Sequence, residues 1–158
     1  MQRPATSAKA SRRETCLTHS VGASPYPVAM MADLWAEVLG VHIRYEVLPG
    51  DLCGLYDFRT QTVFVDSTLT PLPRNSTLMH ELGHAFYGHD GCQPRWEREA
   101  STWSAKQLID PEEFEIAATL FEGSVAIANE LGVLPRDVDN YVNLVLKDGA
   151  DFVSSISS

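Results

Sequence analysis

Two prolines, Pro71 and Pro73, separate a β-prone part of the chain from a helical part, and this division constrains the fold more than any other feature. Before them lie three short runs with strand patterns: residues 41–47, 52–56 and 62–65. The first run alternates apolar and polar side chains, as a half-buried strand does. Only five residues separate the other two, which suits a hairpin. Strands followed by helices indicate an α+β fold.

Six segments have the apolar spacing or the terminal residues of helices. They are residues 31–39, about 75–87, 95–109, 110–123, 124–131 and 135–147. The clearest start is Asp110-Pro111-Glu112-Glu113, with an N-cap aspartate, a proline at the first helical position and a glutamate at the third. The sequence therefore predicts an N-terminal helix, a small three-stranded sheet and then a helical bundle.

A chain of 158 residues fits one folded domain. We expect this domain to span residues 30–148, with a disordered or over-called tail over 1–29 and a flexible tail over 149–158. Residues 1–29 lack hydrophobic periodicity and the apolar region of a secretory signal. Their composition, rich in Arg and Ser and poor in acids, also suits an organellar transit peptide. Met30 and Met31 are alternative start positions.

The formal net charge of −9 is unevenly spread. Residues 1–14 carry a balance of +3, which leaves −12 on the remainder. An acidic surface repels nucleic acid and attracts basic partners, so direct nucleic-acid binding is not expected. No apolar run approaches the roughly 18 residues of a membrane span. The three cysteines have no paired spacing, which favours a cytoplasmic protein without a disulfide framework.

The segment LMHELGHAFYGH, residues 78–89, places His80 and His84 four positions apart, with Glu81 directly after the first. On a helix, positions i and i+4 lie on one face, so both imidazoles can bind one ion. Neutral imidazole nitrogens suit Zn²⁺. Glu81 lies about 100° round the helix from His80. It can therefore reach a water on the metal without being a ligand, and can act as the general base.

An ordinary polar helix is the alternative interpretation, because H-E-x-x-H is a short pattern. Burial weighs against it, since five neighbouring residues are apolar and make this a largely buried helix. They are Leu78, Met79, Leu82, Ala85 and Phe86. Burying two histidines and a glutamate there without a shared partner would be costly. We therefore predict one metal ion at His80 and His84, with Glu81 as the catalytic residue.

A hydrolytic zinc ion normally has three protein ligands and one open position. Five residues after the second histidine are candidates for the third ligand: His89, Asp90, Cys92, Glu97 and Glu99. The first two lie just past the helix end, where turning back onto the metal is awkward, and a lone cysteine is more often a packed or free thiol. Glu97 and Glu99 point about 200° apart on a helix, so only one of them can reach the metal. Periodicity favours Glu99 weakly, because it borders the apolar face of its helix.

Residues 125–141 have a pattern that is typical of helix-turn-helix motifs, in which Ala-x-Glu-Leu-Gly-Val precedes a second helix. That second helix would carry Asp137 and Asp139 with Arg136 as its base, a poor surface for phosphates. We therefore expect these helices to pack against the helices of the metal site.

The chain resembles the ImmA/IrrE family of metallopeptidases, whose zincin-like domain has a short strand region, an H-E-L-G-H helix and a later helix with E-A-x-x-[FW]-A. Here these motifs read His80-Glu81-Leu82-Gly83-His84 and Glu99-Ala100-Ser101-Thr102-Trp103-Ser104. The resemblance covers about residues 31–145. It implies His80, His84 and Glu99 as zinc ligands and Glu81 as the general base. Ser104 replaces the commoner alanine, and the loop between the two helices is short.

Members of that family occur in phages and other mobile elements or in bacterial stress responses, where they cleave or inactivate a helix-turn-helix repressor. The resemblance therefore implies a cytoplasmic zinc endopeptidase whose protein substrate is a DNA-binding repressor, with an anti-repressor role. The alternative is a non-catalytic module with a structural zinc that sequesters the repressor, although Glu81 would then have no use. A small amidase or another zinc hydrolase is a further alternative.

Zincin-type sites often hold the substrate as an added strand along a sheet edge. Residues 62–66, just before the active helix, are the candidate edge. Tyr56, Tyr141 and His89 are candidates for the group that stabilises the oxyanion.

Overall fold

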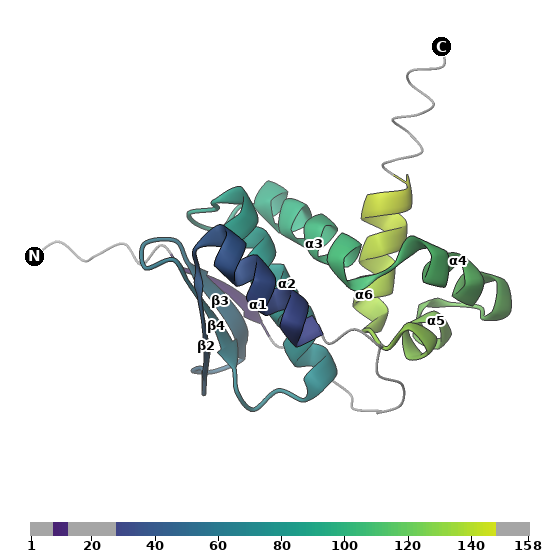
Figure 1. Cartoon of the computed structure of the whole chain (residues 1–158), viewed down its shortest axis with the longest axis horizontal. Helices are drawn as coiled ribbons and strands as arrows, with labels where there is room; N and C mark the ends of the chain where they lie inside the picture. The colour runs from purple at the N-terminus through teal and green to yellow at the C-terminus, as the bar shows by residue number, and fades with distance from the viewer. Residues whose placement is uncertain (1–7, 13–27, 148–158) are drawn as a thin grey trace, which may run out of the picture.

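The computed structural model describes residues 8–12 and 28–147. Figure 1 shows a small sheet at one end of the molecule, with α1 (Val28–Leu39) and α2 (Pro71–Tyr87) lying over it and a group of helices at the other end. α2 contacts two of the strands, α1 and the next helix along the chain. It therefore lies between the sheet and the remaining helices. The predicted α+β fold is confirmed.

The sheet contains the three strands that the sequence predicts and one more. Its strands are β1 (Ala8–Arg12), β2 (His42–Glu46), β3 (Leu52–Asp57) and β4 (Thr62–Asp66). Their order is β1-β3-β4-β2; β3 is antiparallel to β1 and β4, and β4 is parallel to β2. β4 therefore lies inside the sheet. The prediction that residues 62–66 form an edge is wrong, because β2 pairs with the side of β4 that the hairpin leaves open.

Strand β1 belongs to the segment 1–29 that the sequence assigns to a tail. It pairs with the outer side of β3, in a register that places Ser11 opposite Gly54 and Ala8 opposite Asp57. The other parts of the two expected tails, residues 1–7, 13–27 and 149–158, lie outside the described residues.

The helices occupy the predicted segments, with some shifted ends. After α2 come α3 (Pro94–Leu108), α4 (Pro111–Leu120), α5 (Ser124–Leu131) and α6 (Pro135–Asn140), which continues as a π-helix over Tyr141–Leu146. α2 begins at Pro71, earlier than predicted, because the first turn of a helix tolerates prolines, whose missing N–H has no intrahelical partner there. The Asp110 carboxylate accepts hydrogen bonds from the backbone N–H groups of Glu112 and Glu113, as the predicted N-cap does.

Two hydrophobic clusters form the core of the described residues. The first packs α1 and α2 on the sheet and includes Val63 and Leu82. The second joins the end of α3 to α4, α5 and α6 and includes Tyr141. α3 contributes Trp103 to the first cluster and Ala105 to the second. This helix therefore connects the sheet-bearing part of the domain to the C-terminal helices.

Of the two helices with the helix-turn-helix sequence pattern, α6 packs as predicted against a helix of the histidine site, because it contacts α3, whereas α5 contacts α4 and α6. Asp137 of α6 is 4% exposed and accepts a hydrogen bond of 2.7 Å from the Ser76 hydroxyl of α2. Arg136 donates to the same hydroxyl at 3.1 Å. Burial raises the pKa of Asp137, although the hydrogen bond from Ser76 acts in the opposite direction.

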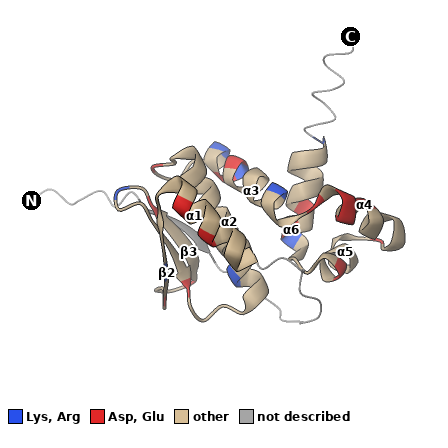
Figure 2. Ribbon diagram, viewed as in Figure 1, with Lys and Arg blue, Asp and Glu red and all other residues tan. Residues whose placement is uncertain are grey.

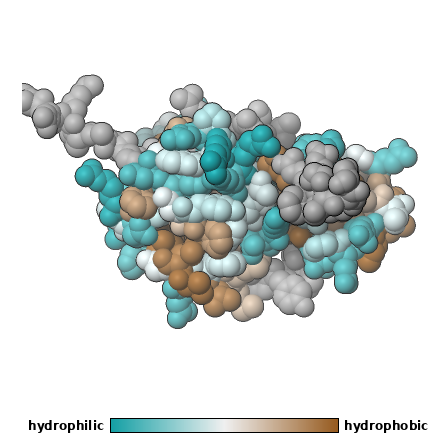
Figure 3. Space-filling model, turned by 90° about the horizontal axis from the view of Figure 1, so that it is seen from above, coloured by the Kyte–Doolittle hydropathy of each residue, from teal (hydrophilic) through white to brown (hydrophobic). Residues whose placement is uncertain are grey.

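The surface of the described residues combines scattered charge with some apolar area. Figure 2 shows both acidic and basic positions along α3, whereas α4 carries acidic ones. Exposed apolar side chains occur at Met30, Leu34 and Val38 of α1. Figure 3 shows hydrophobic residues, in brown, on the surface of the molecule. None of the described helices combines the length and the hydropathy needed to cross a bilayer.

Candidate metal centre

His80 and His84 lie one turn apart on the side of α2 that faces α3. The His84 side chain is 1% exposed and that of His80 is 18% exposed. Their Nε2 atoms are 3.2 Å apart, and the two rings meet edge to face with centroids 4.9 Å apart. The predicted i, i+4 pair therefore presents two imidazole nitrogens to one point in space.

A carboxylate from α3 completes this group, and it belongs to Glu97. Its Oε2 lies 3.4 Å from His80 Nε2, and its Oε1 lies 3.6 Å from His84 Nε2. One ligand atom from each of His80, His84 and Glu97 lies within 4.8 Å of the other two. Among the residues that the structure describes, this is the one group of three with that property.

The approach of α3 to α2 depends on Gly83, which lies between the two histidines. A Cβ atom at this position would come within 2.8 Å of the Ala100 carbonyl oxygen and 3.0 Å of its Cα. Those contacts are shorter than real Cβ atoms show, so the two helices pack backbone against backbone here. Because Glu97 lies three residues before Ala100, it shares the face of α3 that this contact turns toward the histidines.

The chemistry and spacing of the three groups suit a zinc ion. Two imidazole nitrogens and one carboxylate oxygen form a typical ligand set of a hydrolytic zinc site. With zinc–ligand bonds of about 2.0–2.2 Å, neighbouring corners of a tetrahedron lie roughly 3.3–3.6 Å apart. The two Nε2 atoms are 3.2 Å apart, and each lies 3.4 or 3.6 Å from one oxygen of the Glu97 carboxylate, which is close to that edge. The residues present therefore fit the ion that their sequence pattern predicts.

Glu81 lies beside the group but is not part of it. It is 1% exposed and packs against Gly54 of β3. A Cβ atom at Gly54 would lie 3.0 Å from Glu81 Cγ and 3.2 Å from Oε1, and it would also overlap the Thr77 methyl group. The glycine therefore lets the backbone of β3 approach the Glu81 carboxylate closely.

Glu99, the predicted third ligand, points elsewhere. Its Oε1 accepts a hydrogen bond of 2.8 Å from Arg95 Nε, and its Oε2 lies 3.0 Å from His89 Nε2. The hydrogen bond from Arg95 is the main reason that the pKa of Glu99 is lowered, and His89 adds to the effect. Glu99 is outside the group that could hold a metal ion. The structure thus brings Glu97, and not the predicted Glu99, together with the two histidines.

The position of Glu97 in place of Glu99 has a simple geometric cause. Glu97 and Glu99 lie on opposite sides of α3, so the rotation of the helix about its axis decides which one meets the histidines. That rotation follows from the close contact at Gly83 and Ala100, the smallest residues of the two helices there. The signal was present in the sequence as small residues on the facing sides of the two helices.

The other candidates occupy different environments. His89 is 5% exposed, and its Nδ1 lies 2.8 Å from His84 Nδ1. Asp90 and Cys92 are exposed. Of the proposed oxyanion groups, Tyr56 belongs to the first hydrophobic cluster, where burial raises its pKa. Tyr141 belongs to the second cluster, where its ring packs at a tilt against Phe114.

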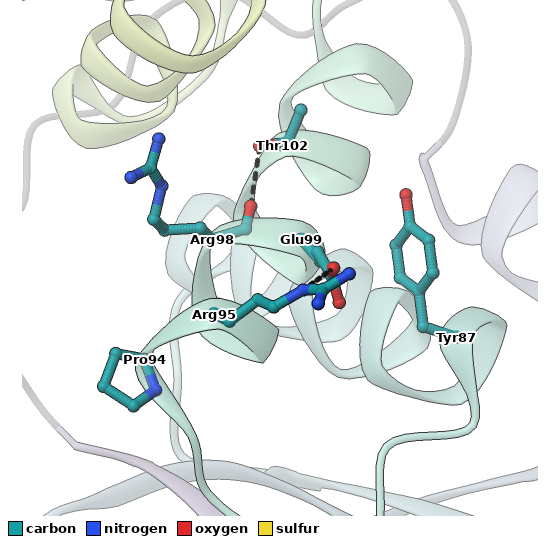
Figure 4. A pocket seen from close by; sticks show the side chains of 6 residues that line it. All are labelled: Tyr87, Pro94, Arg95, Arg98, Glu99 and Thr102. Atoms are coloured by element: carbon teal, nitrogen blue, oxygen red, sulfur yellow. Dashed lines mark hydrogen bonds and ion pairs between the residues drawn. The ribbon is translucent and has the colours of Figure 1, made fainter.

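An open pocket of about 480 Å³ lies beside α3. Figure 4 shows its lining, which consists of Tyr87, Pro94, Arg95, Arg98, Glu99 and Thr102. Arg95 and Glu99 lie against each other in it, and Tyr87 faces them from the end of α2. The three candidate ligands do not line this pocket, so it lies on the Glu99 side of α3 rather than at the metal centre.

Comparison with models of known protein families gives a match. A family model described as the IrrE N-terminal-like domain, Peptidase M78, matches residues 36–139, about two thirds of the chain. The matched segment includes α2, α3 and all four residues discussed above, His80, Glu81, His84 and Glu97. A search of curated proteins found no match to the chain.

Proposed function

Because this chain belongs to the Peptidase M78 family of IrrE N-terminal-like domains, we propose that it is a zinc-dependent endopeptidase that cleaves a protein substrate. Membership of the family makes the chain a metallopeptidase. The identity of the metal, the cleavage within a polypeptide and the substrate are our proposal.

The observation that supports zinc most strongly is the convergence of two imidazole nitrogens and one carboxylate. The Nε2 atoms of His80 and His84 lie 3.2 Å apart, and each lies within 3.6 Å of one of the two Glu97 carboxylate oxygens. Three protein ligands leave the fourth corner of a tetrahedral site for water or substrate. A purely structural zinc site is usually closed by four protein ligands, so this set favours catalysis.

Each residue of the centre has a distinct part in peptide hydrolysis. Zinc, when bound, acts as a Lewis acid that polarises the peptide carbonyl and makes a water more acidic. Glu81 takes the proton of the attacking water and then gives it to the leaving amine. Glu81 follows His80 directly on α2 and is buried beside the backbone of β3, which restricts the movement of its carboxylate.

The substrate lies along β3 rather than β4. An extended peptide can add to a sheet by main-chain hydrogen bonds to an edge strand. Gly54, whose backbone approaches Glu81, belongs to β3, and β1 occupies the outer edge of this strand. A substrate strand there would therefore compete with β1 for the same backbone groups.

The substrate is a basic DNA-binding repressor, acted on in the cytoplasm. The chain carries a net charge of −9, and an acidic surface attracts a basic partner at long range. This charge acts on the rate of encounter, whereas the sheet edge and the metal centre determine where the peptide is cut.

Cleavage of a candidate repressor tests this function. The zinc-loaded chain is incubated with the helix-turn-helix protein encoded by a neighbouring reading frame, and the products are identified by mass spectrometry. We expect one defined cut that a chelator abolishes. Glu81→Gln should slow it by about 10²- to 10⁴-fold, the usual contribution of a general base. Glu113→Gln, at an exposed position of α4, is the matched control and should cut at the normal rate.

The same variant separates cleavage from sequestration. If Glu81→Gln binds zinc and relieves repression as well as the unaltered chain does, the repressor is sequestered and peptide hydrolysis is not the mechanism. If Glu81→Gln no longer relieves repression, the result supports peptide hydrolysis as the mechanism.

A further inference from the structure

A chain of polar contacts connects the exposed surface of α3 to the buried ligand His84. Arg95 Nε donates to Glu99 Oε1 at 2.8 Å, and Glu99 Oε2 lies 3.0 Å from His89 Nε2. The other nitrogen of His89, Nδ1, lies 2.8 Å from His84 Nδ1. The remaining nitrogen of His84, Nε2, is the one that faces His80 and Glu97.

The chemistry of these groups determines the position of each proton. An ionised carboxylate only accepts hydrogen bonds, so the His89 nitrogen that faces Glu99 must carry a hydrogen. In a neutral imidazole the other nitrogen then has a lone pair and accepts. The hydrogen bond between the two Nδ1 atoms therefore needs its proton on His84. With Nδ1 protonated, His84 has its lone pair on Nε2, where a metal ligand needs it.

The His89 ring is also held firmly in its orientation. It is stacked between Tyr87, at a centroid distance of 5.4 Å, and Trp96, at 5.1 Å, with interplanar angles of 12° and 10°. The backbone brings it back onto α2 because Gly88 takes a left-handed conformation with φ of 65°. The His89 N–H then donates to the His84 carbonyl oxygen at 3.0 Å.

We propose that His89 and Glu99 are positioning residues for the metal centre, which fix the tautomer and the ring orientation of His84. Glu99 thus acts on the metal through two imidazoles instead of binding it. Its role toward the metal rests on the proposed function, whereas its effect on the tautomer of His84 does not. Removing such an outer partner of a metal-binding histidine typically weakens metal affinity by about 10- to 100-fold.

Imidazole ¹⁵N NMR of the zinc-free protein reads the tautomers directly. The measurement is made at about pH 8, on the signals of neutral rings. We expect His84 as the Nδ1–H tautomer and His89 as the Nε2–H tautomer. In Glu99→Gln the amide can donate or accept, so both histidines should show a mixture. His84 as the Nε2–H tautomer in the unaltered chain would overturn the proposal.

Zinc affinity is the second readout, measured by competition with a chromophoric chelator. Glu99→Gln and His89→Phe should each weaken binding by about 10- to 100-fold, and His89→Phe keeps a ring between Tyr87 and Trp96. Glu115→Gln, at an exposed position of α4, is the matched control and should bind zinc normally. Unchanged affinity in both altered proteins would contradict the proposal.

Two controls separate a failure to fold from a failure of the proposed zinc chemistry. Circular dichroism establishes whether each variant is folded, and if a variant unfolds, the tautomers of the unaltered chain still decide the question. If the unaltered chain binds no zinc but shows the expected tautomers, the proposed zinc chemistry fails while the control of His84 by His89 and Glu99 stands.

Discussion

Replacing Gly83 with alanine tests the contact that brings α3 to the histidines. The added Cβ would lie 2.8 Å from the Ala100 carbonyl oxygen and 3.0 Å from its Cα, and backbone atoms cannot rotate away as a side chain can. Overpacking of this kind costs up to about 3 kcal/mol. Replacing glycine by alanine in a helix interior stabilises the helix by about 1 kcal/mol. We therefore expect Gly83→Ala to lower the free energy of unfolding by about 2 kcal/mol.

The same change should weaken zinc binding. Relief of the overlap requires α2 and α3 to move apart, which carries Glu97 away from His80 and His84. Urea unfolding measures the loss of stability, and chelator competition measures the loss of zinc affinity. Ala118→Gly, at an exposed position of α4, measures the effect of helix propensity alone. It should lower the free energy of unfolding by about 1 kcal/mol.

A second substitution sharpens the test. Because the overlap involves backbone atoms of Ala100, Gly83→Ala combined with Ala100→Gly should not recover stability or zinc affinity. A single Gly83→Ala variant that is as stable as the unaltered chain, or more stable, and that binds zinc equally well would refute this account of the helix contact.

Three further changes probe other parts of the structure. Gly54→Ala should displace the Glu81 carboxylate and lower kcat by about 10- to 100-fold, with zinc affinity retained; weakened zinc binding would contradict this separation. Lys9→Pro combined with Ala10→Pro removes at least one hydrogen bond from β1 to β3, because neighbouring residues of a strand direct their N–H groups to opposite sides. It should raise kcat/KM for the repressor, and a lower value would count against competition between β1 and substrate. Burial raises the pKa of Asp137, so its contribution to stability is present below the unfolded pKa of about 3.9 and is lost as pH rises through the folded value. In urea unfolding, the free energy of unfolding of the unaltered chain should therefore exceed that of Asp137→Asn by more at about pH 4 than at pH 7. A difference that grows toward pH 7 would show that folding lowers the pKa of Asp137.

The elements that the sequence predicts well are those with strong local signals. α2 is one, because its many apolar residues predict a buried helix and its histidines recur at the i, i+4 spacing of one turn. The cap at Asp110 is another, because its hydrogen bonds reach only two and three residues along the chain. The α+β order also follows from local patterns, since each strand and helix has its own periodicity.

The third ligand depends on a non-local property, the rotation of α3 about its axis. Glu97 and Glu99 are the same residue type and lie two residues apart, so the periodicity of α3 favours Glu99 only weakly. The contact with Gly83 of another helix makes the choice. Strand β1 was missed for a related reason: the sequence Ala8–Arg12 lacks an apolar pattern, and its pairing with β3 is a backbone interaction between distant segments.

The central claim is that one zinc ion is held by His80, His84 and Glu97. Anomalous diffraction at the zinc absorption edge, from crystals of the zinc-loaded chain, tests it most directly. We expect a single peak, bonded at about 2.0–2.2 Å to both Nε2 atoms and to the Glu97 carboxylate. A peak coordinated by Glu99, or no peak between the two histidines, would contradict the account.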